Sequence, residues 1–148
     1  MSTKTRPELS LHNPYWIDRH RYYELKHFCL QYPLWKKARS ALDGAKKATI
    51  TNISNSKTNV INSPTERCAE ERVFYSNRID MVEKAAKETD SILYRYILRA
   101  VTEGMSYDYL RTSLNIPCSK DTYYNLYRRF FWLLSKERQG GDLGENCR

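Results

Sequence analysis

Residues 115–134, NIPCSKDTYYNLYRRFFWLL, decide the fold, because they predict a long helix that is both aromatic and basic. The ten positions from Tyr123 to Trp132 hold six aromatic side chains and two arginines. Ser119 is of the residue type that caps helix N-termini, so we expect the helix to begin there and to run to about Lys136. A helix of this composition must bury one face and leave the other in water.

The apolar side chains of this helix divide into an inward stripe and a surplus. The stripe recurs at spacings of three and four and consists of Tyr123, Leu126, Tyr127, Phe130, Leu133 and Leu134. Phe131 and Trp132 fall outside it and need cover, either from the aromatic N-terminal helices or from a second subunit. We therefore expect a homo-oligomer, with a dimer favoured, formed through the C-terminal half of this helix. The aromatic N-terminal region is the alternative surface.

A shorter helix is expected just before the long one. Ser106 can cap it, and Asp108 lies in its first turn. Its inward side chains are Tyr107, Leu110 and Leu114. A tight turn then leads into the capped long helix, and a short helix followed by a turn and a longer helix is typical of a helix-turn-helix. We place this motif at residues 106–136. In such a motif the first turns of the second helix enter the major groove of DNA.

The polar face of the long helix carries the residue types that read DNA. The candidate DNA-binding residues are Lys120, Asp121, Tyr124, Asn125, Arg128, Arg129 and Lys136. Asparagine can pair with adenine, arginine with guanine, and lysine or arginine with phosphate. The first five are best placed for bases, whereas Arg129 and Lys136 lie further along and are expected at the backbone. The alternative is an ordinary solvated helix face.

The chain as a whole predicts an all-α protein, a helical bundle with a C-terminal helix-turn-helix and an aromatic-rich N-terminal helical arm. We expect a basic, aromatic helical region (1–43), a polar linker (44–62), a helical domain (63–138) and a flexible tail (139–148).

Several residues predict where the other helices begin and end. In the N-terminal region, Asn13 is expected to cap a first helix with Pro14 at its first position. Pro33 can begin a second helix, 33–42, which Gly44 would end. In the helical domain, the sequence Ser63-Pro64-Thr65-Glu66 forms a capping box. Two helices should follow it, with a new cap at Thr89-Asp90-Ser91 and an end at Gly104.

The net charge of +8 is concentrated in the two flanks of the chain. Residues 1–62 carry eleven Lys/Arg against four Asp/Glu (+7), residues 63–104 carry seven against eight (−1), and residues 105–138 carry six against three (+3). A basic surface attracts phosphates regardless of sequence, so double-stranded DNA is the expected partner. The basic segment 1–62 could contact DNA, host RNA polymerase or a sister subunit. Alternatively, the charge only keeps the protein in solution.

No catalytic motif stands out. The sequence has no GxxxxGK[ST], GxSxG or GxGxxG motif, and its four cysteines form no CxxC pair. His12, His20 and His27 have no acidic or thiol partner except the nearby Cys29, so we expect no metal and no cofactor. No apolar run approaches the length of a membrane span. We therefore expect a non-enzymatic cytoplasmic protein with no membrane partner.

Residues 106–135, SYDYLRTSLNIPCSKDTYYNLYRRFFWLLS, resemble the C-terminal part of phage-encoded late transcriptional regulators of the ArpU/RinA type. Those proteins end in a helix-turn-helix similar to region 4 of sigma factors. The resemblance covers roughly residues 63–138. It implies a regulator in the bacterial host cell that binds DNA near a phage late promoter and activates structural and lysis genes.

Two other functions fit the same pattern. A small terminase subunit also carries a helix-turn-helix and recognises phage packaging DNA, but it assembles into an oligomeric ring. A helical protein–protein interaction module would use the aromatic helices to bind a partner, and its basic charge would then be incidental.

Overall fold

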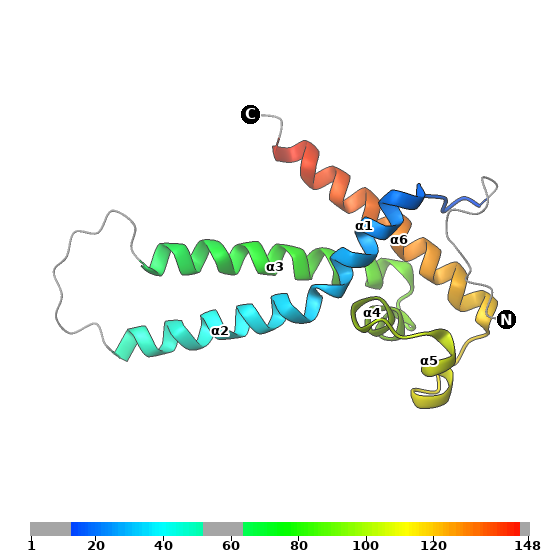
Figure 1. Cartoon of the computed structure of the whole chain (residues 1–148), viewed down its shortest axis with the longest axis horizontal. Helices are drawn as coiled ribbons and strands as arrows, with labels where there is room; N and C mark the ends of the chain where they lie inside the picture. The colour runs from blue at the N-terminus through cyan, green and yellow to red at the C-terminus, as the bar shows by residue number, and fades with distance from the viewer. Residues whose placement is uncertain (1–12, 52–63, 146–148) are drawn as a thin grey trace.

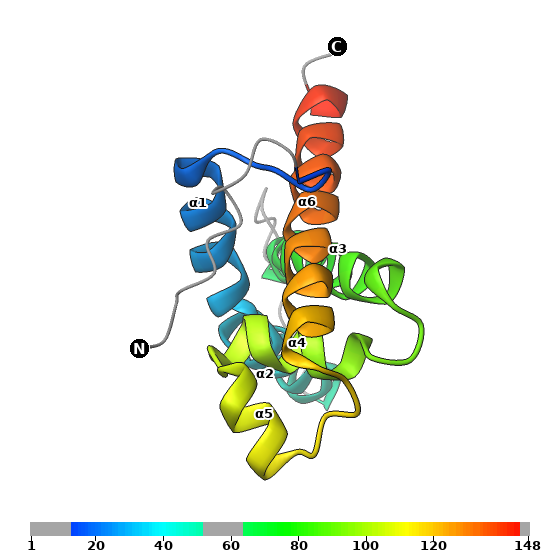
Figure 2. The ribbon, with the colours of Figure 1, turned by 90° about the vertical axis from the view of Figure 1, so that its right-hand side faces the viewer.

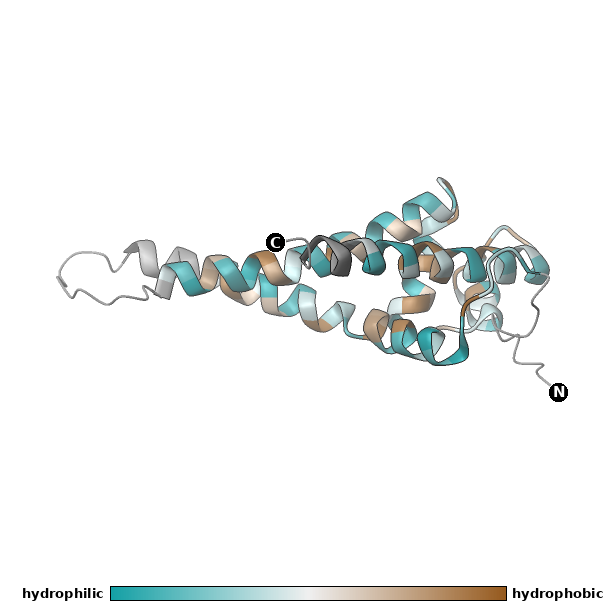
Figure 3. Cartoon of the chain, turned by 90° about the horizontal axis from the view of Figure 1, so that it is seen from above, coloured by the Kyte–Doolittle hydropathy of each residue, from teal (hydrophilic) through white to brown (hydrophobic). Residues whose placement is uncertain are grey.

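The computed structural model describes residues 13–51 and 64–145, and every regular element in them is helical (Figure 1). The helices are α1 (Arg19–Leu30), α2 (Tyr32–Thr51), α3 (Pro64–Thr89), α4 (Tyr94–Glu103), α5 (Tyr107–Ser113) and α6 (Lys120–Glu145). The predicted all-α class and bundle-like packing are confirmed. Hydrophilic and hydrophobic segments alternate along the helices, as amphipathic helices require (Figure 3).

The first helix begins later than its sequence predicts. Asp18 is the N-cap of α1, and its carboxylate accepts a hydrogen bond from the His20 N–H at 3.0 Å. Asn13 instead closes a local turn, because its side-chain oxygen accepts from the Tyr15 N–H at 2.9 Å. The predicted cap at Asn13 is therefore wrong. Asparagine stabilises turns and helix caps by the same side-chain-to-backbone bond, so residue type alone does not distinguish the two.

Helices α2 and α3 form a long antiparallel hairpin that projects from the rest of the molecule (Figure 1). Near its base the Tyr32 hydroxyl donates to the Glu83 carboxylate at 2.6 Å. Further out, Arg72 pairs with Asp43 at 3.0 Å. The two contacts are eleven residues apart on both helices, from Tyr32 to Asp43 on α2 and from Glu83 to Arg72 on α3, so the helices stay in register.

Gly44 does not end α2, which continues to Thr51. The predicted helix end at Gly44 and the predicted start of the linker there are therefore wrong. A glycine inside a helix costs only about 1 kcal/mol, and packing along α3 offsets this cost. Residues 52–62 of the predicted linker and Ser63 of the predicted capping box lie outside the described residues. Pro64 does begin α3, as predicted.

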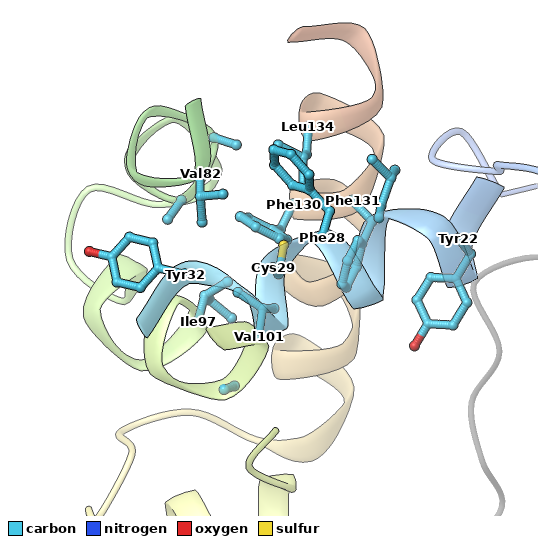
Figure 4. Packing of buried hydrophobic residues seen from close by; sticks show 14 of the residues in the cluster. Tyr22, Phe28, Cys29, Tyr32, Val82, Ile97, Val101, Phe130, Phe131 and Leu134 are labelled. Carbon is cyan, nitrogen blue, oxygen red and sulfur yellow. The ribbon is translucent and has the colours of Figure 1, made fainter. Parts of the chain in front are cut away.

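One buried cluster joins the N-terminal helices to the predicted helical domain. Figure 4 shows Phe28 and Cys29 of α1 close to Phe130 of α6, with Val82 of α3 and Ile97 of α4 around them. The N-terminal region therefore contributes to the core from Ile17 to Trp35 and is not an arm beside it. Helix α6 carries more aromatic side chains than α3 and α4 can bury, so the N-terminal helices bury the remainder.

The predicted turns within the domain are confirmed. The Asp90 carboxylate accepts from the Leu93 N–H at 2.7 Å and so recaps the chain before α4. Gly104 ends α4 in the left-handed conformation, with φ of 69°. Helix α6 runs to Glu145, past the predicted start of the tail at 139. Ion pairs of Glu137 with Lys84 at 3.0 Å and of Arg138 with Glu24 at 2.9 Å hold this part of α6 against α3 and α1.

Candidate nucleic-acid interface

Helices α5 and α6 begin at the two predicted serine caps. The Ser106 hydroxyl accepts from the Tyr109 N–H at 3.2 Å, and the Ser119 hydroxyl accepts from the Thr122 N–H at 3.3 Å. Each bond satisfies one of the free N–H groups at a helix start. Both helix starts are therefore confirmed, although the helix-turn-helix itself stays a prediction.

The turn between α5 and α6 contains no glycine, because Asn115 takes the left-handed conformation instead. Its φ is 56°, and asparagine is the residue that tolerates this region best after glycine. The reversal lets the next residue, Ile116, bury its side chain, and the Ile116 N–H donates to the Leu110 carbonyl at 3.2 Å. The turn is therefore well defined despite its composition.

Tyr107 fastens α5 to the start of α6. Its hydroxyl donates to the Cys118 carbonyl at 2.8 Å, and its ring lies 5.4 Å from the ring of Tyr123, centroid to centroid. Tyr123 is buried, and desolvation raises the pKa of its phenol well above the usual range, so it stays neutral. Figure 2 shows α5 beside the first turns of α6. These contacts fix the angle between the two helices.

The inward stripe of α6 faces the core as predicted. Tyr123, Phe130 and Leu134 are buried, and Leu126, Tyr127 and Leu133 are half-buried. The Tyr127 hydroxyl lies 2.5 Å from the Tyr22 hydroxyl of α1. This contact crosses from one end of the chain to the other and ties α1 to α6.

The two surplus rings are covered by the same chain. Phe131 is completely buried, and the Tyr22 ring packs edge-on against it at 5.1 Å. The Trp132 ring is half-buried, with Tyr15 at 5.4 Å on its edge and the Lys136 ammonium 3.4 Å above its centre. The need for cover is therefore met by the N-terminal region, and it no longer argues for self-association through the C-terminal half of α6.

Five of the predicted DNA-binding residues lie together on the first turns of α6. Lys120, Asp121 and Asn125 are exposed, whereas Tyr124 and Arg128 are half-buried. The Arg128 guanidinium donates to the Asn125 side-chain oxygen at 3.3 Å. The ring of Tyr124 lies between Tyr123 and the Lys120 ammonium, at 5.2 and 6.0 Å. The surface therefore presents two cations, a carboxylate and an amide in one group.

The other two predicted residues lie apart from this group and have partners within the chain. Arg129 donates to the Glu88 carbonyl in the last turn of α3 at 3.4 Å, where a positive charge is favourable. Lys136 stacks on Trp132 and lies about 24 Å along the helix from Lys120 at 1.5 Å per residue. Both are exposed, but their contacts serve the packing of α6.

Sequence reasoning missed two exposed residues of α5. Arg111 lies in the last turn of α5, close enough to the turn for its charge to act on Cys118. Burial raises the pKa of the Cys118 thiol, and the Arg111 charge partly opposes this shift. Tyr109 is 48% exposed on the same helix. The sequence contained part of this signal, because Tyr109 falls on the other side of the helix from Tyr107, whereas Arg111 lies four residues after Tyr107 at the edge of the inward face.

Comparisons with known proteins find no matching family model, no matching curated protein and no matching solved structure. The resemblance of residues 106–135 to phage regulators thus gains no support from them. Within residues 13–51 and 64–145, no three His, Cys, Asp or Glu side chains gather as metal ligands would. In the same described ranges, no helix combines the length and the apolar character that a membrane crossing needs.

Proposed function

We propose that the protein binds double-stranded DNA and reads its sequence with the first turns of α6 in the major groove. The observation that carries this proposal is the group formed by the exposed Lys120 and Asn125 and the half-buried Arg128, on a helix start whose angle to α5 is held by Tyr107. A major groove admits one α-helix, and the first turns of α6 have the free polar face that such docking requires.

The chemistry of the group suits base edges. Arginine binds guanine through two hydrogen bonds and asparagine binds adenine in the same way, each worth about 1–3 kcal/mol of discrimination. The hydrogen bond from Arg128 to Asn125 holds both side chains on one side of the helix. Lys120 and Arg111 are both exposed and can bind phosphates of the backbone. Asp121 would repel phosphate but can accept from a cytosine amino group.

We further propose that the DNA site belongs to a phage late promoter, which is the role implied by the resemblance of residues 106–135. The small terminase subunit remains the rival within this setting. The mass of the protein in solution separates the two roles, because a terminase subunit forms a ring whereas a regulator with paired half-sites forms a dimer.

The test is a selection of bound sequences from a random duplex library, followed by affinity measurements at several salt concentrations. The wild-type protein should enrich one sequence and should lose affinity steeply as salt rises. Replacing both Asn125 and Arg128 with alanine should reduce the preference for that sequence at least about tenfold, since each base pair misread costs about 1–3 kcal/mol.

A matched control removes the same two residue types from the hairpin. Asn77 and Arg67 are both exposed on α3, away from α5 and α6, so their double alanine variant should keep the sequence preference. Circular dichroism of both variants should match the wild type. A wild-type protein that enriches no sequence, or an Asn125/Arg128 variant that keeps the full preference, refutes readout by α6.

A further inference from the structure

The α2–α3 hairpin leaves large apolar side chains in water. Leu34 is 66% exposed, Val73 is 57% exposed and Phe74 is 47% exposed. Single exposed apolar residues are normal on a protein surface, but a cluster of them marks an interaction site. Leu34 and Phe74 belong to one cluster, because both line the same groove.

This groove has a volume of about 740 Å³ and lies where the hairpin meets α1 and α6. Its apolar lining includes Phe28, Trp35 and Phe74. Two arginines lie over these rings, with Arg78 at 3.5 Å from the centre of Phe74 and Arg138 at 4.3 Å from the centre of Phe28. The groove is therefore lined by aromatic rings, and its charged side chains are Arg78, Arg138 and Glu24, of which the last two pair with each other at 2.9 Å.

The charges on α3 identify the occupant. Glu70 and Arg78 lie four residues on either side of Phe74, so all three side chains share one face of the helix. Glu70 is exposed and Arg78 is half-buried. When two copies of a helix pair antiparallel about a two-fold axis at its central residue, positions equally far from that residue face each other. Such an axis at Phe74 brings each Glu70 opposite the Arg78 of the other copy.

We propose that a second copy of this chain covers the face, with α3 packed antiparallel on α3 of its partner and the two-fold axis at Phe74. The pattern of Glu70, Phe74 and Arg78 is complementary to itself, which is the property that a symmetric dimer interface needs. The arrangement buries Phe74 against Phe74 and does not depend on DNA binding.

The proposal has a consequence for the whole assembly. The hairpin projects from one side of the bundle, and α5 and the start of α6 lie at the far end from its tip (Figure 1). Antiparallel pairing about the middle of α3 therefore places the two α5–α6 units at opposite ends of the dimer.

The first test measures the mass in solution by sedimentation equilibrium over a range of concentrations. The wild-type protein should be a dimer at tens of micromolar, and Phe74→Glu should be a monomer, because it places two carboxylates at the axis. The matched control is Ile92→Glu, which adds a charge to a 76% exposed residue in the turn between α3 and α4. This control should dimerise like the wild type, and circular dichroism should show that both variants are folded.

The second test reverses the charges. Glu70→Arg alone should weaken the dimer at least about tenfold, the change that 1.4 kcal/mol produces. Adding Arg78→Glu should restore association, because the new arginine then faces the new glutamate of the other copy. These positions are about 12 Å apart along the helix at 1.5 Å per residue, too far to pair within one chain.

A wild-type protein that stays monomeric at all concentrations overturns the proposal, and so does a Phe74→Glu variant that dimerises as strongly as the wild type. Equal loss in the Ile92→Glu control also overturns it, since the effect would then be one of added charge alone. If the double reversal is no stronger than Glu70→Arg alone, the antiparallel α3 pairing is wrong.

Discussion

Phe131 on α6 and Phe74 on α3 are both phenylalanines on helices of 26 residues, yet Phe131 is fully buried and Phe74 is 47% exposed. Each also has an arginine nearby, at positions 129 and 78. The Phe131 ring is surrounded by Tyr22, Phe130 and Tyr127, at centroid distances of 5.1, 5.0 and 4.9 Å. The Phe74 ring contacts its neighbour Tyr75 at 5.3 Å and has the Arg78 guanidinium above it.

The difference comes from the layer that covers each helix. Helix α1 crosses α6 and is held there by Arg21, which donates to the side chain and the carbonyl of Ser135. The outer half of α3 packs on α2 (Figure 1), and beside Phe74 the side chains of α1 and α6 line an open groove without covering the ring. Phenylalanine is therefore a core residue at position 131 of α6 and a surface residue at position 74 of α3, and only Phe74 offers an apolar surface to another molecule.

The sharpest test of this contrast is to remove each ring. Phe131→Ala should lower the free energy of unfolding by about 3–5 kcal/mol, because it deletes a fully buried ring and leaves a cavity. Phe74→Ala should change the stability of the isolated monomer by about 0.5 kcal/mol or less. Urea denaturation at low protein concentration measures both. Equal effects would show that the two rings have the same surroundings.

Alkaline pH should weaken the contact between α1 and α6. Burial, the nearby Tyr22 and its hydrogen bond raise the pKa of Tyr127 well above its ordinary value of about 10. The folded state thus favours the neutral phenol. Its stability is complete below about pH 10 and falls above it, by up to about 1.4 kcal/mol per pH unit for each such tyrosine.

Urea unfolding measured between pH 8 and pH 11 checks this slope. Tyr127→Phe removes the ionisable group and should give a shallower loss of stability above pH 10, although it should be less stable at pH 8 because the hydrogen bond between the Tyr22 and Tyr127 hydroxyls is lost. Tyr109→Phe is the control, since that ring is exposed on α5. An unchanged slope in Tyr127→Phe would contradict the assignment.

Replacement by alanine should lower the stability of the protein at Asn115, in the α5–α6 turn, and raise it at Gly44, in α2. Asn115→Ala should destabilise the protein by about 1 kcal/mol. The backbone at this position is left-handed, and alanine tolerates this conformation less well than asparagine does. Asn115→Gly should cost little. Gly44→Ala should stabilise the protein by about 0.5–1 kcal/mol, since this residue lies in a helix with open space around it. Thermal denaturation compares the three variants.

A small effect is also expected for the hairpin ion pair. Arg72 and Asp43 are 3.0 Å apart, but their side chains are 46% and 42% exposed. Replacing Arg72 with alanine should therefore cost less than about 1 kcal/mol, and the cost should shrink as salt rises. A loss above about 2 kcal/mol in denaturant titrations would mean that water is excluded from the ion pair.

Local signals in the sequence were enough for most of the C-terminal half. Ser106, Ser119, Asp90 and Gly104 act as caps where they were predicted, and the stripe of α6 faces inward. Five candidate residues of α6 share one surface, as their spacing indicated. These features depend on bonds between residues only a few positions apart, which a linear pattern contains.

Features that depend on contacts between distant residues could not be predicted from local sequence patterns. Asn13 and Asp18 are both good caps, and the choice between them depends on where α1 meets α6. Gly44 stays helical because α3 lies alongside it, and Arg129 is drawn to the end of α3. Helical periodicity shows which side chains must be buried, but it does not show which segment buries them. That choice depends on contacts between residues more than a hundred positions apart, such as the contact between Tyr22 and Phe131.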